Sequence, residues 1–78
     1  MKALYRVDRK TIGGSWVAGK APVFTNKREA KSYAYNWVKD KKHWHRYNSH
    51  NRDYGELKAT VIGIDQNLGN EFWVAEYT

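Results

Sequence analysis

The sequence predicts an α+β domain in which one long amphipathic helix packs on one face of an antiparallel β-sheet of four to five strands. Segments at 2–7 and 56–65 alternate apolar and polar side chains with the two-residue period of a strand. A segment that begins at residue 25 instead repeats its apolar side chains with helical spacing. The chain has 78 residues, so we expect one small domain over 1–78 with the order β-β-(β)-α-β-β.

The part before the helix is expected to form two or three strands. The first is predicted over 2–7. Gly13 and Gly14 tolerate the backbone angles of a tight hairpin turn, so 15–18 is predicted to return as a second strand. A third short strand at 21–24 is predicted at a bend or a sheet edge, because it contains a proline, which lacks a backbone N–H.

The helix is predicted to start at Asn26, a good N-cap residue, with Glu29 three residues later. A stripe at helical spacing is expected to face the sheet and consists of Ala30, Tyr33, Ala34, Trp37, Val38, Lys41 and Trp44. We interpret Trp44 as the end of this stripe rather than as a stacking platform. The opposite side is polar or basic and carries Lys27, Arg28, Lys31, Tyr35, Lys39 and Lys42.

A polar loop at 48–55 is expected to lead into a C-terminal hairpin. Its strands are predicted at 56–65 and from Phe72 to Tyr77, with a turn at 66–70. One sheet face would stay uncovered by the helix. We expect an exposed aromatic patch or a homodimer interface there, formed by Trp16, Ile62, Ile64, Trp73 and Tyr77.

The charges separate along the chain. The net charge is +6, but residues 1–52 hold thirteen Lys and Arg against three carboxylates, whereas 53–78 carry a net charge of −4. This asymmetry has two interpretations: basic residues that keep a small domain soluble, or a basic face that attracts anionic surfaces. We favour the basic face because the cations cluster on the helix and just beyond it.

Composition and motifs argue against catalysis and against a bound cofactor. The chain has no cysteine, no phosphate-binding glycine loop and no nucleophile motif, so we expect neither an enzyme nor a cofactor. His43, His45 and His50 are close in sequence, but the first two point to different sides of a helix, and we expect no metal site. No apolar run is long enough to span a membrane, and we expect a cytoplasmic protein.

The segment 39–52 mixes cations with aromatic side chains. Cations neutralise phosphates, and aromatic rings either stack on bases or fill a groove in a protein, so this composition serves two classes of partner. The predicted partner-binding residues are Lys27, Arg28, Lys31, Tyr35, Lys39, Lys42, Arg46, Tyr47 and Arg52.

The chain resembles small proteins that bacteriophages encode to disable host machinery, in particular type I-F anti-CRISPR proteins. The resemblance rests on a Met-Lys-Ala strand at 1–5, a capped Ala-rich helix from 25 to 34, and a hairpin of aliphatic and aromatic residues at 61–65 and 72–77. The plan is also similar to phage inhibitors of host RNA polymerase. The passage from Phe24 into the helix is similar to the DNA-binding arm domains of phage integrases.

This resemblance implies a non-enzymatic inhibitor that occupies a nucleic-acid-binding surface of a host complex. The leading hypothesis is therefore a phage-encoded protein, acting in the host cytoplasm, whose basic helix face and following loop bind a host protein or nucleoprotein complex. Direct binding of DNA or RNA with little sequence preference is the first alternative. An oligomeric interaction module that uses the aromatic sheet face is the second.

Overall fold

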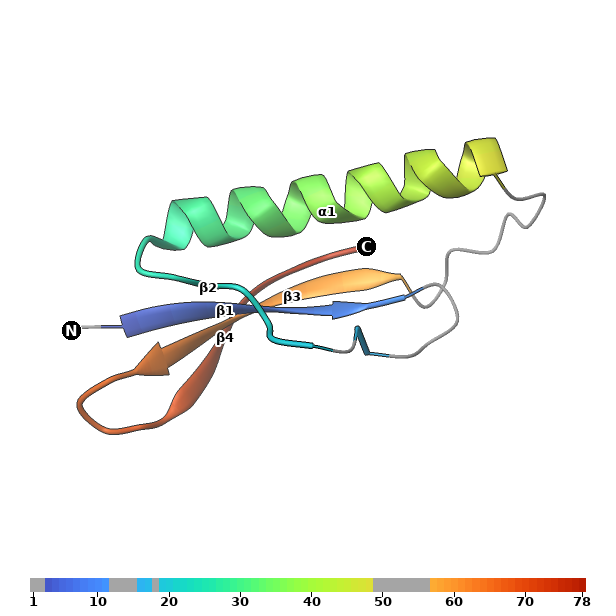
Figure 1. Ribbon diagram of the computed structural model, residues 1–78. Helices are drawn as coiled ribbons and strands as arrows, with labels where there is room; N and C mark the ends of the chain where they lie inside the picture. The colour runs from blue at the N-terminus through green and yellow to red at the C-terminus, as the bar shows by residue number, and fades with distance from the viewer. Residues whose placement is uncertain (1–2, 12–15, 18, 49–56) are drawn as a thin grey trace.

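The elements follow one another in the order strand, strand, helix, strand, strand. The computed structural model describes residues 3–11, 16–17, 19–48 and 57–78, without the side chains of 44–48. The elements are β1 (Ala3–Lys10), β2 (Val23–Phe24), α1 (Lys27–Asn48), β3 (Lys58–Asp65) and β4 (Glu71–Tyr77) (Figure 1). The predicted α+β fold, one helix on an antiparallel sheet, is confirmed.

The four strands form one sheet in the order β2-β1-β3-β4, and every neighbouring pair is antiparallel. The central pairing joins β1 to β3 along their whole length, from Ala3 opposite Asp65 to Lys10 opposite Lys58. Helix α1 runs along one face of this sheet (Figure 1). The short strand β2 and the strand β4 therefore lie at opposite edges, and the predicted edge position of 21–24 is confirmed.

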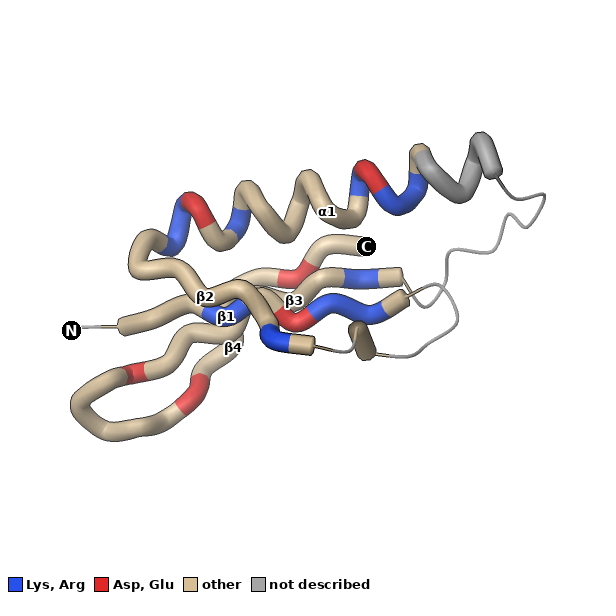
Figure 2. The backbone as a smooth tube through the Cα atoms, in the orientation of Figure 1, with Lys and Arg blue, Asp and Glu red and all other residues tan. Residues whose placement is uncertain are grey.

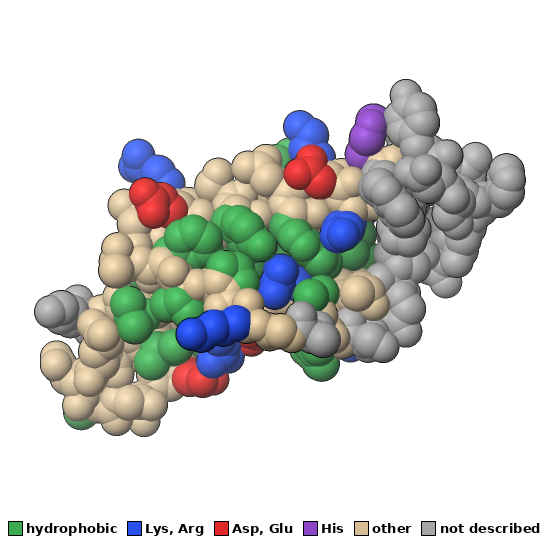
Figure 3. Space-filling view, in the orientation of Figure 1, with side chains coloured by type: hydrophobic (Ala, Val, Ile, Leu, Met, Phe, Trp, Pro, Cys, Tyr) green, Lys and Arg blue, Asp and Glu red, His purple; other side chains and the backbone are tan. Residues whose placement is uncertain are grey.

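The core lies between α1 and the central strands. Val7 and Val61 face each other across β1 and β3 and are completely buried, and Ala30 and Ala34 of the helix are buried above them. Alanine side chains allow the helix to approach the sheet closely. Figure 3 shows hydrophobic side chains gathered in a band between the helix and the strands.

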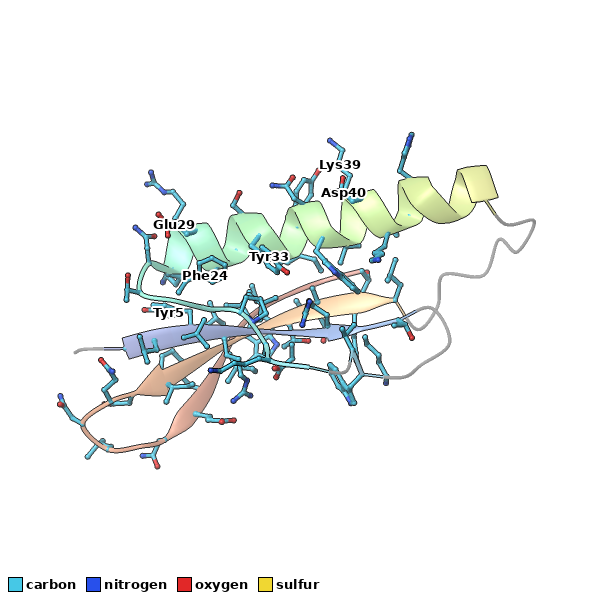
Figure 4. All side chains as sticks on the ribbon, in the orientation of Figure 1. Tyr5, Phe24, Glu29, Tyr33, Lys39 and Asp40 are labelled. Atoms are coloured by element: carbon cyan, nitrogen blue, oxygen red, sulfur yellow. The ribbon has the colours of Figure 1, made fainter. Side chains whose placement is uncertain are left out.

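Aromatic rings close the core on the β2 side. Phe24 and Tyr33 pack with their ring centroids 5.5 Å apart, and Tyr5 packs against the same core. Figure 4 shows these three side chains in the space between helix and sheet, whereas Lys39 points away from the sheet. These rings are half-buried, and burial of this kind contributes up to about 2 kcal/mol each in a domain that has no cysteine for disulfides.

The N-terminal strands differ from the prediction in their bounds. Strand β1 extends to Lys10, three residues further than expected. In place of a returning strand at 15–18, the described residues form one isolated bridge between Lys10 and Trp16, and the backbone N–H of Val17 donates to the carbonyl of Arg9 at 2.8 Å. The predicted turn at 13–14 lies outside the described residues, as do residues 15 and 18.

The predicted helix start is confirmed. The Asn26 side-chain oxygen accepts hydrogen bonds from the backbone N–H groups of Arg28 at 2.8 Å and Glu29 at 3.3 Å, which satisfies two otherwise unpaired donors of the first turn. The predicted core stripe is also confirmed through Val38. Lys41 is an exception: it is exposed, and its ammonium lies 5.9 Å from the ring of Trp37. The Trp44 side chain lies outside the description.

The C-terminal hairpin is present as predicted, with an irregularity in its pairing. Its turn is held by the Asp65 carboxylate, which accepts from the N–H groups of Asn67 and Leu68, and by Gly69 at a positive φ of 74°. The register shifts between Val61 and Ile62, so that Val61 opposes Ala75 while Ile62 opposes Trp73. A β-bulge of this kind turns the remaining side chains of the strand to the other face.

That bulge corrects one prediction about the uncovered sheet face. Trp16 and Trp73 are exposed, but Tyr77 belongs to the helix side, where it packs against the core and touches Tyr35. Regular alternation from Trp73 would have kept Tyr77 on the face of Trp73. The bulge places it instead beneath the helix flank.

Candidate anion-binding groove

Two adjoining open pockets, of about 810 and 340 Å³, follow the flank of α1 that faces the edge strand β4. Both are lined by Tyr35 and Tyr77, so they form one furrow with a pair of tyrosines in its middle. We call this furrow the helix–β4 groove. The residues that line it are Asn26, Lys27, Arg28, Lys31, Ser32, Tyr35, Val38, Lys39, Lys42, Glu76, Tyr77 and Thr78.

Helical spacing explains why the cations share this flank. Arg28 and Lys31 are three residues apart, as are Lys39 and Lys42, and Tyr35 lies between the two pairs on the same side of the helix. Lys31 and Lys42 are half-buried at the inner wall of the groove, while Arg28 and Lys39 are exposed at its rim. Figure 2 shows the helix cations in two groups, one in the first turns and one in the C-terminal half.

The tyrosine pair and the last residue join the helix to β4. The rings of Tyr35 and Tyr77 meet edge to face, with centroids 6.0 Å apart and an interplanar angle of 81°. The Lys42 ammonium donates a hydrogen bond to the backbone carbonyl of Thr78 at 3.0 Å. These contacts connect the two walls of the groove, while Tyr35 remains 54% exposed.

The groove cations have little countercharge. Within the described part of the chain, none of Lys27, Arg28, Lys31 and Lys39 forms an ion pair. Glu76 is the one carboxylate among the groove-lining residues, and it already lies 3.9 Å from Lys58 and accepts a hydrogen bond from Thr60. An anionic ligand would therefore meet four cations that need no existing pair to be broken, whereas Lys42 already donates to the Thr78 carbonyl.

The acidic hairpin neutralises the sheet rather than the helix. Arg6 of β1 reaches across β3 and donates to Glu71 of β4 at 2.8 Å, and it also donates to Asp8 at 2.8 Å. The hydrogen bond from Arg6, reinforced by its charge, lowers the pKa of the Glu71 carboxyl. The bonds to Glu71 and Asp8 in turn raise the pKa of the Arg6 guanidinium. These three charges of the sheet are thus paired with one another, whereas Lys27, Arg28, Lys31 and Lys39 of the helix form no ion pair in the described part of the chain.

The structure brings together six of the nine residues predicted to bind a partner. Lys27, Arg28, Lys31, Tyr35, Lys39 and Lys42 all line the groove. The backbone of Arg46 and Tyr47 lies in the last turn of α1, but the structure does not describe their side chains. Arg52 lies outside the described residues.

Sequence reasoning missed Tyr77 as part of the site. A signal for its position was available in the acidic residues of the last strand. Glu71 and Glu76 are five residues apart, so a regular strand would have placed them on opposite faces and would have put one carboxylate beneath the helix. Keeping both away from the core requires a bulge between them, and that bulge moves Tyr77 to the helix side.

Side chains that ligate metal ions do not cluster in the described residues. No group of three His, Asp or Glu side chains in the described ranges is placed to hold a metal ion; His50 and the side chain of His45 lie outside those ranges. In the same part of the chain, no helix combines the length and apolar character needed to cross a bilayer. No protein-family model, curated protein or solved structure matches the chain.

Proposed function

We propose that this protein is a non-enzymatic binding protein that engages an anionic partner through the helix–β4 groove. The observation that carries the proposal is the row of groove cations without carboxylate partners. Cations arranged along a concave surface concentrate an anionic ligand and accelerate its association. The Tyr35–Tyr77 contact joins the two walls before a ligand arrives, which favours binding because less must be ordered on association.

Heparin, a polyanion without bases, tests this proposal. The double variant Lys31→Glu/Lys39→Glu lowers the net charge by four units within the groove. The control Lys20→Glu/Lys41→Glu lowers it equally at exposed cations that do not line the groove. We expect the groove variant to lose roughly ten-fold or more of the heparin affinity measured by titration, and the control to lose much less. Equal losses in the two variants would refute the groove as the binding site.

A second candidate is inhibition of a host nucleic-acid-handling or defence complex, with the same groove docked on an acidic protein surface. Arg28 and Tyr35 favour it, because arginine and aromatic side chains are enriched in protein–protein interfaces. A phage-encoded inhibitor of this kind would block the surface where the complex holds its own nucleic acid. A pull-down from host lysate tests this candidate. If the Lys31→Glu/Lys39→Glu variant captures every partner that the wild type captures, the candidate fails.

A further inference from the structure

The groove presents its charges in two separate pairs. Arg28 and Lys31 form the first pair and Lys39 and Lys42 the second, with Tyr35 between them. From Arg28 to Lys42 the helix rises about 21 Å, room for roughly six phosphates at the 3.4 Å spacing of one B-form strand and for fewer on a stretched strand. This spacing suits an extended anionic chain that crosses the tyrosines and touches cations on both sides of them.

Tyr35 offers such a chain a flat contact. The ring is braced edge to face by Tyr77, which restricts its rotation, and more than half of the residue is exposed. A restrained aromatic ring loses little entropy when a second flat group stacks on it. Its position between the cation pairs means that a ligand held at both ends would pass directly over it.

These features together distinguish between anionic ligands. Sulfated sugars and acidic peptides satisfy the cations, but their anionic units carry no aromatic face to stack on Tyr35. Duplex DNA keeps its bases stacked inside the helix, where Tyr35 cannot reach them. A single strand supplies phosphates at regular intervals and leaves its bases free to stack on an aromatic side chain. Each stacked base is worth roughly 1–3 kcal/mol, or about five- to 150-fold in affinity.

We propose that the ligand of the helix–β4 groove is single-stranded nucleic acid, with its phosphates on the two cation pairs and a base stacked on Tyr35. This inference rests on the proposed function, since it names the partner of the same groove. Binding would then have little sequence preference, because every nucleotide offers a phosphate and a base that can stack.

The decisive experiment compares ligands that share their phosphates but differ in their bases. Wild-type protein is titrated with an oligothymidylate of about twelve nucleotides, with an abasic strand of equal length, with the corresponding duplex and with an oligoglutamate peptide, all at one salt concentration. We expect the oligothymidylate to bind at least five-fold tighter than the abasic strand and tighter than the peptide. Equal affinity for the abasic strand, or tighter binding of the duplex or the peptide, would overturn the inference.

Substitutions at Tyr35 provide the matched control. Tyr35→Phe keeps the ring and is expected to retain the preference for the oligothymidylate over the abasic strand. Tyr35→Leu removes the ring and is expected to abolish that preference, so that the oligothymidylate and the abasic strand bind with equal affinity. A Tyr35→Leu protein that is folded by circular dichroism and retains the preference would also overturn the inference.

The two proposals fail in different ways. If heparin binding is insensitive to Lys31→Glu/Lys39→Glu, the groove is not an anion site and the proposed function fails. If heparin binding follows the groove charges but the bases contribute nothing, the proposed function survives and only the single-strand assignment is lost.

Discussion

At the scale of single residues, Arg6 connects three strands. Its guanidinium starts on β1, crosses β3 and bonds Glu71 on β4, while it also holds Asp8 beside it. The Arg6 and Asp8 side chains keep 27% and 29% of their surface accessible and that of Glu71 keeps 55%, so water screens the pair with Glu71 in part. The contact therefore orders the sheet face more than it stabilises the fold.

The Arg6–Glu71 pair predicts a pH dependence with a definite sign. Because Arg6 lowers the pKa of Glu71 in the folded state, the stabilisation is fully present above the ordinary glutamate pKa of about 4.3 and is lost as the pH falls through the lower, folded value. We expect the wild type to be more stable than Glu71→Gln at pH 7, and the difference to vanish in strong acid. Urea unfolding at pH 7 and in strong acid measures the difference in the free energy of unfolding. A difference that persists or grows on acidification would contradict this account.

At the scale of elements, the N-cap sets where α1 begins and therefore where the groove cations lie. Removing the Asn26 side chain leaves the N–H groups of Arg28 and Glu29 without their acceptor. We expect Asn26→Ala to lower the free energy of unfolding by about 1 kcal/mol, which corresponds to roughly 4–8 °C in Tm for a domain of this size. Chemical and thermal unfolding measure the loss.

Two further variants separate capping from a general effect of losing an amide. Asn26→Asp keeps an acceptor at the cap and is expected to restore the stability. Asn36→Ala removes an exposed amide from the helix interior. The hydrogen bond from this amide to the Ser32 hydroxyl is long at 3.4 Å and alanine is the better helix former, so the change should be neutral or slightly stabilising. If Asn36→Ala costs as much as Asn26→Ala, the cap is not what holds the helix start.

Elements whose bounds are set by residues close in sequence could be predicted. Elements whose position depends on contacts between distant residues could not. Asn26 and the stripe from Ala30 to Val38 predict the helix and the face that it buries, because capping and periodicity act within a few residues. The six predicted binding residues that line the groove follow from the same periodicity.

The strand that completes the groove depends on tertiary pairing instead. The pairing of β1 with β3 joins residues about fifty-five positions apart and leaves no local pattern. The bulge in β4 breaks the two-residue period on which strand predictions rely. Tyr77 was therefore assigned to the wrong face, and the sequence predicted a basic helix face and the following loop without a contribution from the last strand.

At the scale of the whole molecule, the charge division along the chain becomes a division between surfaces. The acidic C-terminal hairpin contributes Glu71 and Glu76, and both bind cations of the sheet, Arg6 and Lys58. The net charge of +6 is consequently not spread evenly, because four helix cations of the groove, Lys27, Arg28, Lys31 and Lys39, form no ion pair in the described part of the chain. Binding should then depend on where a cation lies rather than on the net charge alone.

The salt dependence of binding tests this distinction. Lys39→Gln and Lys20→Gln each remove one exposed cation and lower the net charge by the same amount, but of the two only Lys39 lines the groove. Each phosphate contact on a single strand contributes about −0.7 to the slope of log affinity against log salt. For the oligothymidylate we therefore expect Lys39→Gln to make the slope shallower by about 0.7 and Lys20→Gln to leave it unchanged. Equal slopes for the two variants would mean that the net charge of the molecule, and not the groove, attracts the ligand.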